Sequence, residues 1–232
     1  MAKLKRLLAP PFWRTPKKAY KWTVSPRPGP HRKFESIPLQ ILVRDILKLA
    51  ETGKEAKTII HTGEVFVDGK KRKDHAYPVG LMDVIVIPKL KKYFRVVPFA
   101  KGLNLVEIPE KESKSKISKI VGKTVVKKGR MQLNLHDGKN ILVEKGAYST
   151  GDSLLIEVPA QKILEHVKLG KGNVGLIIKG KNSGKNVVIK EVTKVRSREP
   201  NKIICDIEDK EVEVREDYVI VTGEKKPLVT VE

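Results

Sequence analysis

The pattern of hydrophobic residues changes once along this 232-residue chain, and that change limits the folds it can adopt. A helical pattern, with apolar residues three or four positions apart, is present only between about residues 36 and 63. Beyond about residue 96, short alternating or continuous apolar runs are separated by glycine-containing turns, which is typical of small β domains. Hydrophobic residues make up only 40% of the chain and aromatic residues 5%, so one large core is not expected. The sequence therefore predicts an α+β chain of several small domains.

Two short helices are predicted in the helical region. The apolar residues of the first follow the 3.6-residue period; they are Leu39, Leu42, Val43, Ile46, Leu47 and Ala50. Thr52 and Glu55 have the spacing of a capping box, which begins a second helix. Gly63 is expected to end it, because glycine readily adopts the left-handed conformation of a helix C-cap. The two helices should therefore meet at a tight corner.

Short apolar runs follow the helices, and we expect each of them to be a strand. An Asp68-Gly69 turn and the basic run 70–73 separate the first two of them, and Pro88 closes the second. In chain order the predicted strands are 65–67, 84–87, 125–126, 131–135, 141–143, 154–158, 176–178, 187–189, 203–207, 212–214 and 218–221. So many short strands at this spacing indicate small barrels.

Four parts are expected from these patterns. Prolines interrupt any regular element that begins in the first part, so we expect an extension there and not a domain. The parts are an extension at 1–36, a helix pair with its hairpin at 37–95, a central β domain at 96–170 and a second small β-barrel at 171–232.

The charge of the chain indicates a polyanionic partner. Lys and Arg number 48 against 27 Asp and Glu, a formal net charge of +21, and residues 1–100 carry +14 of it. Such an excess repels itself unless a polyanion neutralises it. A membrane is disfavoured because no apolar run approaches the roughly 20 residues needed to span a bilayer. Nucleic acid is therefore the expected partner, and cytoplasm the expected compartment, since no signal-peptide core is present and there is one cysteine.

Seven of the 19 acidic residues of the second half cluster near its end. They are Asp206, Glu208, Asp209, Glu211, Glu213, Glu216 and Asp217. Phosphate would be repelled there, so we expect this edge to face solvent or a neighbouring protein.

The extension combines cations with aromatic residues. Disordered tails are usually poor in aromatics, whereas cations beside aromatics suit irregular RNA, in which phosphates are neutralised and bases are stacked. The aromatic residues are Phe12, Trp13, Tyr20, Trp22 and Phe34, and the basic ones are Lys3, Lys5, Arg6, Arg14, Lys17, Lys18, Lys21, Arg27, Arg32 and Lys33. The extension is interpreted as an RNA-penetrating arm, and the alternative is a tail whose tryptophans pack on the next domain.

No catalytic, metal or cofactor site is expected. The five histidines are scattered without metal-ligand spacing, and Cys205 lies in an apolar run without a cation to activate it. Gly180 to Lys185 resembles a phosphate loop, but Asn186 replaces the magnesium-binding Ser or Thr, and a strand-like run follows where a helix must begin. The sequence therefore predicts neither an enzyme nor a protein with a small-molecule substrate.

Residues 37–87 resemble the alpha-L RNA-binding fold shared by a bacterial small-subunit ribosomal protein, pseudouridine synthases and a tyrosyl-tRNA synthetase. The matching pieces are the helix pair, then a run from Ala56 to Lys70, and later Val79-Gly80 before the strand at 84–87. The chain departs from the usual Gly-Asp pair, because Leu81 and Met82 separate Gly80 from Asp83. This departure affects the register expected for the last strand.

The segment from Gly172 to Lys185 looks like a KOW motif, a glycine-punctuated strand–loop–strand found in ribosomal proteins and transcription elongation factors. A basic arm, an alpha-L fold, a central β domain and a KOW-like barrel in this order resemble the archaeal and eukaryotic S-four-e family of small-subunit ribosomal proteins. Lys3 to Arg6 and Pro10 to Trp13 add to the resemblance, which covers essentially the whole chain. It implies binding to small-subunit ribosomal RNA in a ribonucleoprotein that translates.

Beyond the arm, the resemblance implies three groups of RNA-binding residues. Cations in the first turns of a helix oppose its dipole, and a phosphate docked there reverses that effect, which favours the second group independently. The groups are Arg44 and Lys48 on the first helix, Lys54 and Lys57 on the second, and Lys70, Lys71, Arg72 and Lys73 at the hairpin. Lys179, Lys181 and Lys185 of the glycine-rich loop are further candidates, with a plain tight turn as the alternative.

The preferred hypothesis is a structural, rRNA-binding constituent of the small ribosomal subunit. Two alternatives stand beside it. A KOW-type factor would bind the ribosome or nascent RNA transiently. An RNA-modifying enzyme would need a catalytic domain of well over 100 residues, for which the two small β domains leave no room.

Overall fold

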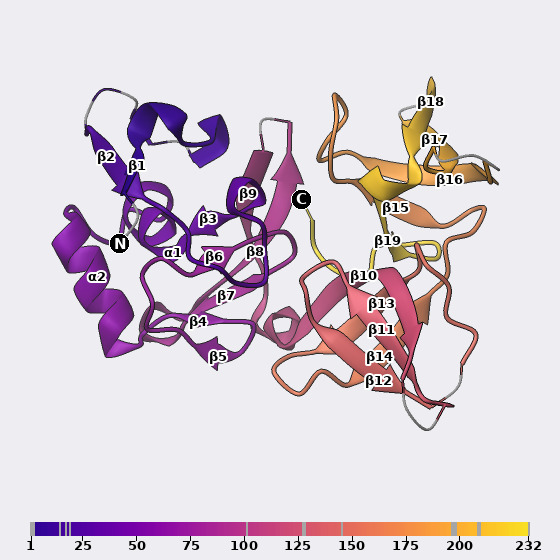
Figure 1. The fold of residues 1–232 in the computed structure, drawn as a ribbon, viewed down its shortest axis with the longest axis horizontal. Helices are drawn as coiled ribbons and strands as arrows, with labels where there is room; N and C mark the ends of the chain where they lie inside the picture. Colours follow the sequence, from indigo (N-terminus) through magenta and orange to yellow (C-terminus); the bar gives the residue numbers. More distant parts are fainter. Residues whose placement is uncertain are drawn as a thin grey trace. The chain divides into compact units, whose positions relative to one another are not determined.

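The computed structural model describes residues 3–13, 15–16, 18, 20–100, 102–126, 129–144, 146–195, 199–207 and 210–231 (Figure 1). The chain forms two compact units. The first unit contains Met1–Val97 and Lys101–Lys114, and the second contains Pro98–Ala100 and Ser115–Glu232. Among the described residues, no helix has the length and apolar character needed to cross a membrane.

The N-terminal segment is folded into the first unit. Strand β1 (Lys3–Lys5) pairs antiparallel with β2 (Trp22–Val24), and short 3-10 turns follow at Arg6–Leu8 and Pro11–Trp13. Trp13 has no exposed surface, and its Nε1 donates to the carbonyl of Ser36 at 2.8 Å. The prediction that residues 1–36 lack regular structure is therefore wrong, because a large apolar side chain packs into the core and orders the chain around it.

Two polar contacts hold the end of this segment on the rest of the first unit. Arg27 forms an ion pair with Asp74 at 3.1 Å. His31 Nε2 lies 2.9 Å from Asp83 Oδ2, and both side chains are almost fully buried. The His31 ring covers Gly80 so closely that a Cβ there would lie 2.3 Å from the ring. The same Asp83 carboxylate accepts a hydrogen bond from the Gly80 amide at 2.9 Å, which closes the Gly-Leu-Met-Asp loop.

The first helix is shorter than its apolar pattern predicts. Helix α1 (Leu39–Ile41) continues as a π-helical turn (Leu42–Ile46), in which the Leu47 amide donates to the Leu42 carbonyl at 2.9 Å. Lys48 then adopts a positive φ of 52°, which ends the helix before Ala50. All of α1 is buried, including residues off the predicted face, so burial by neighbouring elements and not one amphipathic stripe stabilises it.

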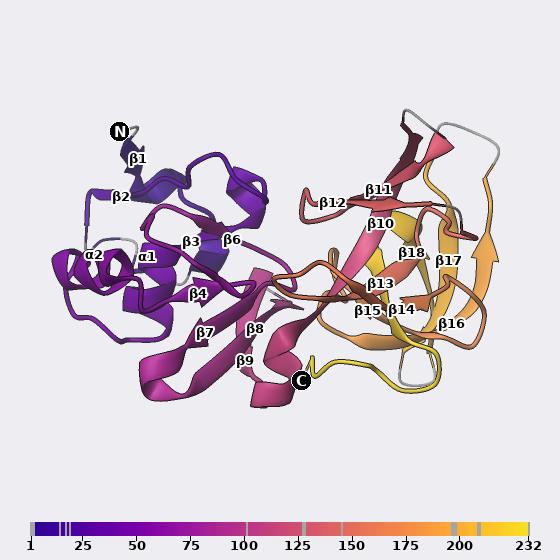
Figure 2. The ribbon, with the colours of Figure 1, turned by 90° about the horizontal axis from the view of Figure 1, so that it is seen from below.

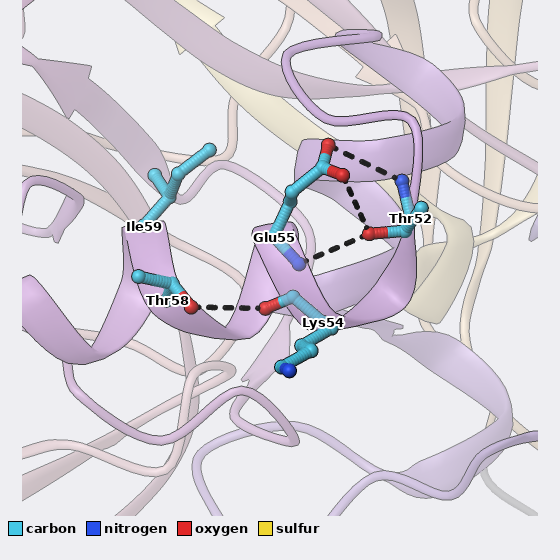
Figure 3. Close-up of a pocket in the computed structure, with 5 residues that line it drawn as sticks. All are labelled: Thr52, Lys54, Glu55, Thr58 and Ile59. Carbon is cyan, nitrogen blue, oxygen red and sulfur yellow. Dashed lines mark hydrogen bonds between the residues drawn. The ribbon is translucent and has the colours of Figure 1, made fainter.

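Helix α2 (Gly53–Thr62) begins and ends as predicted. The Thr52 side chain accepts a hydrogen bond from the Glu55 amide at 3.2 Å, and the Glu55 carboxylate reaches back to the Thr52 amide (Figure 3). Gly63 ends the helix in the left-handed conformation, with φ 75°. The predicted capping box and glycine C-cap are both confirmed.

A five-stranded sheet with the order β5-β4-β7-β8-β9 supports the helices, and a separate pair joins β3 to β6. The turn after β4 has positive φ at both Asp68 and Gly69, as predicted for this pair of residues, and the strand after Asp83 has the predicted bounds, Val84–Ile87. The strands are β3 (Ile37–Pro38), β4 (Phe66–Val67), β5 (Lys70–Lys71), β6 (Pro78–Val79), β7 (Val84–Ile87), β8 (Lys92–Phe99) and β9 (Gly102–Glu107). Figures 1 and 2 both show β4, β7 and β8 side by side.

The second unit contains a five-stranded sheet with the order β12-β11-β10-β13-β14. Its longest strand, β10, has a bulge between Ile120 and Gly122. Lys116 of β10 and Asp137, just after β11, form a fully buried ion pair at 2.9 Å. The strands are β10 (Ser115–Val125), β11 (Met131–Leu135), β12 (Asn140–Val143), β13 (Ser153–Glu157) and β14 (Ile163–Val167).

A further sheet of the second unit has the order β18-β17-β16-β15-β19, and all five of its strands were expected from the sequence. The buried Lys119 Nζ donates to the Val219 carbonyl at 2.8 Å, which ties β10 to this sheet. Cys205 packs in its core, as predicted. The strands are β15 (Val174–Ile177), β16 (Asn186–Thr193), β17 (Lys202–Ile207), β18 (Lys210–Arg215) and β19 (Val219–Gly223).

Candidate nucleic-acid interface

The exposed side of α2 carries the two lysines that the sequence singled out. Lys54 and Lys57 are both exposed, in the first two turns of the helix. Lys54 points away from the Thr52 and Glu55 capping pair (Figure 3). The capping box uses the Glu55 carboxylate on the helix start, so this carboxylate does not neutralise the lysines directly. The helix dipole is unfavourable for cations at this end of the helix. An anion bound here would be stabilised by the dipole and by the two lysines together.

Cations from two segments, the N-terminal segment and α2, converge on His75, a buried residue of the loop before β6. Burial lowers the pKa of His75, and the charges of Lys57, Arg27 and His61 lower it further, whereas Asp74 acts in the opposite direction. The rings of His61 and His75 have their centroids 6.4 Å apart. The N-terminal segment, α2 and the loop therefore share one positively charged neighbourhood.

The hairpin of β4 and β5 adds a second group of cations. Lys70, Lys71 and Lys73 are exposed, as expected for residues that contact a partner. The Lys71 side chain lies against the end of α2, since a Cβ on Gly63 would fall 1.8 Å from its Cε. Arg72 differs, because its guanidinium stacks on the Tyr77 ring at 4.3 Å and is partly buried. Three of the four predicted hairpin cations therefore present their charge to solvent.

The corner residue Arg44 is engaged within the chain. Its Nε and terminal nitrogen donate to the two carboxylate oxygens of Asp45 at 2.8 and 2.9 Å, and it lies over the Tyr20 ring at 5.2 Å. The Asp45 carboxylate raises the pKa of Arg44. A primary role for Arg44 in holding phosphate does not fit this geometry, because its guanidinium is engaged in the ion pair with Asp45. Lys48, the other predicted corner residue, is exposed.

The predicted residues of the N-terminal segment divide into two groups. Trp13 and Arg6 are buried, and Arg6 donates to the Thr15 carbonyl, so neither offers a face to RNA in this fold. The RNA-binding roles expected for these two residues are wrong, because their side chains complete the core of the first unit. Those exposed are Lys5, Lys18, Lys21, Trp22, Arg27, Arg32 and Lys33. Arg14, Lys17 and the side chain of Lys3 lie outside the described residues.

One position in the glycine-rich loop of the second unit requires glycine for structural reasons. Gly184 has φ 90°, and a Cβ there would lie 2.9 Å from the Pro98 carbonyl oxygen. Its amide also donates to the Ile177 carbonyl at 2.8 Å, which closes the loop. Lys179, Lys181 and Lys185 are exposed around it. Strand β16 follows the loop directly, so the geometry of a nucleotide-binding phosphate loop is absent from these described residues.

The acidic cluster is largely neutralised by neighbouring cations on the same sheet. Lys190 bridges Asp206 at 3.1 Å and Glu211 at 2.8 Å. Lys202 pairs with Glu213, and Arg215 pairs with Asp217. Glu208 and Asp209 lie outside the described residues. Strand β18 forms the edge of its sheet, so this charge-paired edge is less repulsive to phosphate than its composition suggests.

Buried acidic groups elsewhere serve the fold. Burial by itself would raise the pKa of Asp137, but Lys116, His136 and Lys139 outweigh it and hold the pKa well below its usual range. Asp152 accepts hydrogen bonds from the amides of Ser149 and Leu169 at 2.9 Å and so orders a turn. Within the described parts of the chain, no group of three or more His, Cys, Asp or Glu could hold a metal ion.

Sequence reasoning missed the residues that complete the cationic neighbourhood of α2. The sequence gives no RNA-binding role to His61 or His75, whereas it predicts Arg27 to contact RNA as part of the extension and not beside α2. Nothing local in the sequence indicates that Arg27 lies next to Asp74, because 47 residues separate them. The spacing of Lys54 and Lys57 was the signal that could be read locally.

A capped helix with exposed lysines, a basic hairpin beside it and a cationic N-terminal segment define a class: an RNA-binding protein built on an S4 domain. The S4 domain model matches residues 37–85, and the RS4NT (NUC023) domain model matches residues 2–33. A third model, described as Ribosomal family S4e, matches residues 90–163. The chain belongs to the S4e family of ribosomal proteins.

Similar proteins cover almost the whole chain. The small ribosomal subunit protein eS4 of Archaeoglobus fulgidus is 44% identical over 228 residues, covering 97% of this chain and 96% of the relative. The eS4 protein of Methanosphaera stadtmanae is also 44% identical, covering 98% of this chain and 94% of the relative. A crystal structure of the 30S ribosomal protein S4e from Thermoplasma acidophilum covers 82% of this chain and 96% of its own, with a TM-score of 0.71 and 28% identity. The family consists of ribosomal structural proteins and not of enzymes, as the sequence predicted.

Proposed function

We infer that this chain is a structural constituent of the small ribosomal subunit that binds and stabilises its rRNA and so supports translation. The observation that carries this function is the 44% identity to small-subunit protein eS4 over 97% of the chain. The S4 domain at residues 37–85 and the net charge of +21 supply the chemistry for RNA binding.

The first unit is proposed to grip the RNA backbone along α2 and the β4–β5 hairpin. Lys54 and Lys57 stand on the positive end of the helix dipole, so a phosphate there is attracted by both. Lys70, Lys71 and Lys73 extend the cationic surface along the hairpin. These contacts position the protein on RNA without reading its sequence, because phosphates are the same at every nucleotide.

The N-terminal segment is proposed to add stacking contacts at exposed aromatic residues that have a cation beside them. The Lys21 ammonium lies 5.7 Å from the Trp22 ring centroid, and Lys33 lies 5.7 Å from that of Phe34. Trp22 and Phe34 are 44% and 64% exposed, so their rings have surface available for a base. A base stacked on such a ring would place its phosphate near the lysine.

Finer assignments in the second unit are also proposals. The loop from Gly180 to Lys185 is assigned to a KOW-type barrel, with Lys179, Lys181 and Lys185 at phosphates, because its glycine spacing matches that motif. The division at residues 36, 95 and 170 is kept only as a proposal for four functional parts, since in the fold the N-terminal segment and β9 belong to the first unit. Neighbouring ribosomal proteins are expected at β18, where charge pairing removes much of the repulsion between the strand and a partner.

The experiment that tests the function is sedimentation of small ribosomal subunits through a high-salt wash. A structural constituent is expected to remain at one copy per subunit, because its contacts with rRNA are many and partly buried. A KOW-type factor that binds transiently would be removed by the wash. Loss of the protein from washed subunits would contradict the structural role.

Salt dependence of binding to isolated rRNA tests the mechanism. Each neutralised phosphate contributes a log–log slope of about −0.7 on single strands and about −0.9 on duplex DNA, so a steep slope is expected. A nearly flat slope would contradict a phosphate-dominated grip.

Deletion of residues 1–36 is a poor test of the N-terminal contacts. It removes Leu4 and Trp13 from the core of the first unit, so lower affinity would also follow from unfolding. Substitution of exposed residues such as Lys21 and Trp22 separates the two effects.

A further inference from the structure

The outward face of strands β10, β11 and β12 carries a ladder of uncharged residues. The pairing register places two rows of three residues on this face: Gly122, Asn134 and Asn140, and then Thr124, Gln132 and Leu142. Side chains alternate across a strand, so Leu133 and Ile141 point to the opposite face, where both are buried. No charged residue occupies these six positions, although charged residues make up 32% of the chain.

We call this outward face of β10, β11 and β12 the amide face. Hydrogen bonds between its side chains order it and leave some of their donors and acceptors available. Gln132 Nε2 donates to Asn134 Oδ1 at 2.9 Å, and Asn134 Nδ2 lies 3.5 Å from Thr124 Oγ1. A primary amide has two N–H donors and an acceptor oxygen with two lone pairs, so each retains capacity for a partner. Asn140 and Thr124 are exposed. The face therefore presents donors and acceptors together, at fixed positions on a sheet.

The flanking charges do not make this face an electrostatic site. Arg130 precedes β11 and Glu144 follows β12, so opposite charges lie at the same end of the ladder. Among these six positions Leu142 is the one large apolar side chain, at 54% exposure, so the positions offer mainly hydrogen bonding. Neutral hydrogen bonding is the interaction this face offers.

We propose that this amide face binds the minor groove of an A-form RNA duplex. That groove is wide and shallow, and it displays 2′-hydroxyls and base edges, which donate and accept hydrogen bonds as amides do. Gly122 keeps the face open, because a Cβ there would meet only Asn134 Nδ2, at 3.6 Å. The inference rests on the proposed function, in which cations elsewhere hold the RNA backbone, and it adds a site that recognises RNA over DNA.

The test measures binding of the full chain to a short RNA duplex and to a DNA duplex of the same sequence, at several salt concentrations, by fluorescence anisotropy. The variant replaces Gln132, Asn134 and Asn140 with alanine. We expect it to lower affinity for the RNA duplex about tenfold, the loss expected from two or three neutral hydrogen bonds. Affinity for the DNA duplex and the salt slope should stay as in the wild type, because every phosphate-binding cation is retained.

A second variant guards against misfolding of the first. Gly122→Val keeps every amide and suits a strand, but adds bulk to the face, so it should reduce the preference for RNA in the same way. Unchanged RNA affinity in both variants would overturn the proposal and leave the face to a protein neighbour. Equal losses on RNA and DNA would overturn it as well.

The matched control, Lys54→Gln with Lys57→Gln, separates this inference from the proposed function. It should weaken binding to both duplexes and flatten the salt slope while leaving the RNA preference intact. If the control has no effect on affinity, the proposed phosphate grip fails; if the control behaves as expected and the amide variants do not, the amide face fails alone.

Discussion

The two tryptophans have opposite surroundings, although both lie in the same basic, aromatic-rich segment. Trp13 is completely buried and hydrogen-bonded to Ser36, whereas Trp22 is 44% exposed beside Lys21. Residue type and local charge were the same for both, so only packing distinguishes the core residue from the candidate contact.

Alanine at these two positions should separate stability from binding. Trp13→Ala is expected to lower the free energy of unfolding by about 3–5 kcal/mol, the usual cost of deleting a buried aromatic side chain. Trp22→Ala should leave stability nearly unchanged and weaken binding to single-stranded rRNA by about 1–3 kcal/mol, the usual value for one stacked base. Urea unfolding and anisotropy measure the two effects. An equal loss of stability in both variants would contradict the assignment.

The buried pair of Lys116 and Asp137 makes the second unit sensitive to loss of one partner. Asp137→Asn leaves the lysine charge buried without a counter-charge, so the free energy of unfolding should fall by about 3–5 kcal/mol. Adding Lys116→Met to it should recover part of the loss, because the uncompensated charge is then removed. A double variant no more stable than the single one would contradict this explanation; urea unfolding of the three proteins decides.

The same pair predicts how stability depends on pH. The pKa of Asp137 is lowered in the folded state, so its contribution is present above the unfolded pKa and is lost as pH falls through the acidic range. The stability advantage of the wild type over Asp137→Asn should therefore shrink below about pH 4, the ordinary pKa of an aspartate. A difference that stays constant from pH 7 to pH 3 would exclude this linkage.

At the scale of elements, the sequence predicted correctly those helix ends and turns of the first unit that depend on hydrogen bonds between residues close in the chain. The capping box of Thr52 and Glu55, the Gly63 C-cap and the Asp68-Gly69 turn all form as expected. The first helix was predicted too long, because its apolar pattern continues to Ala50 although Lys48 ends the helix. Strands β8 and β9 were not expected in the first unit, although each pairs with the strand that precedes it in the chain.

Helix α2 should show opposite effects of its lysines on stability and on binding. Lys54→Gln removes a cation from the positive end of the helix, so stability should rise by a few tenths of a kcal/mol, about 0.3. RNA affinity should fall, and the log–log salt slope should become less negative by about 0.7–0.9, because the variant neutralises one phosphate fewer. Thermal unfolding and salt titrations measure the pair of effects. Lys210→Gln on β18, outside the proposed interface, is the control and should change neither the affinity nor the slope.

For the whole molecule, charge is distributed so that one part of the chain is suited to hold RNA. Residues 1–100 carry +14 of the net +21, and acidic residues on β17, on β18 and in the turn after β18 are paired with Lys190, Lys202 and Arg215. The sequence predicted this asymmetry correctly from composition. It could not show that pairing within the sheet neutralises much of the acidic cluster.

Hydrogen exchange of the full chain with and without rRNA tests this distribution. Amides of α2 and of the β4–β5 hairpin should be protected by RNA, because they lie beneath the proposed phosphate contacts. Amides of β18 should exchange at the same rate in both states. Strong RNA-dependent protection of β18, with none in α2, would contradict the proposed orientation.

The family, the helix pair, most of the strands and the cationic surface of α2 follow from order and spacing along the chain, because caps, turns and alternation act over a few residues. Only the tertiary packing determines which of the predicted RNA-binding residues remain exposed to solvent. Trp13 and Arg6 were drawn into the core and Arg44 into an ion pair with Asp45. Contacts such as those of Arg27 with Asp74 and His31 with Asp83 join residues about 50 positions apart, and a periodic pattern carries no information at that range. The basic N-terminal segment is therefore part of a folded unit, and only the tertiary structure shows it.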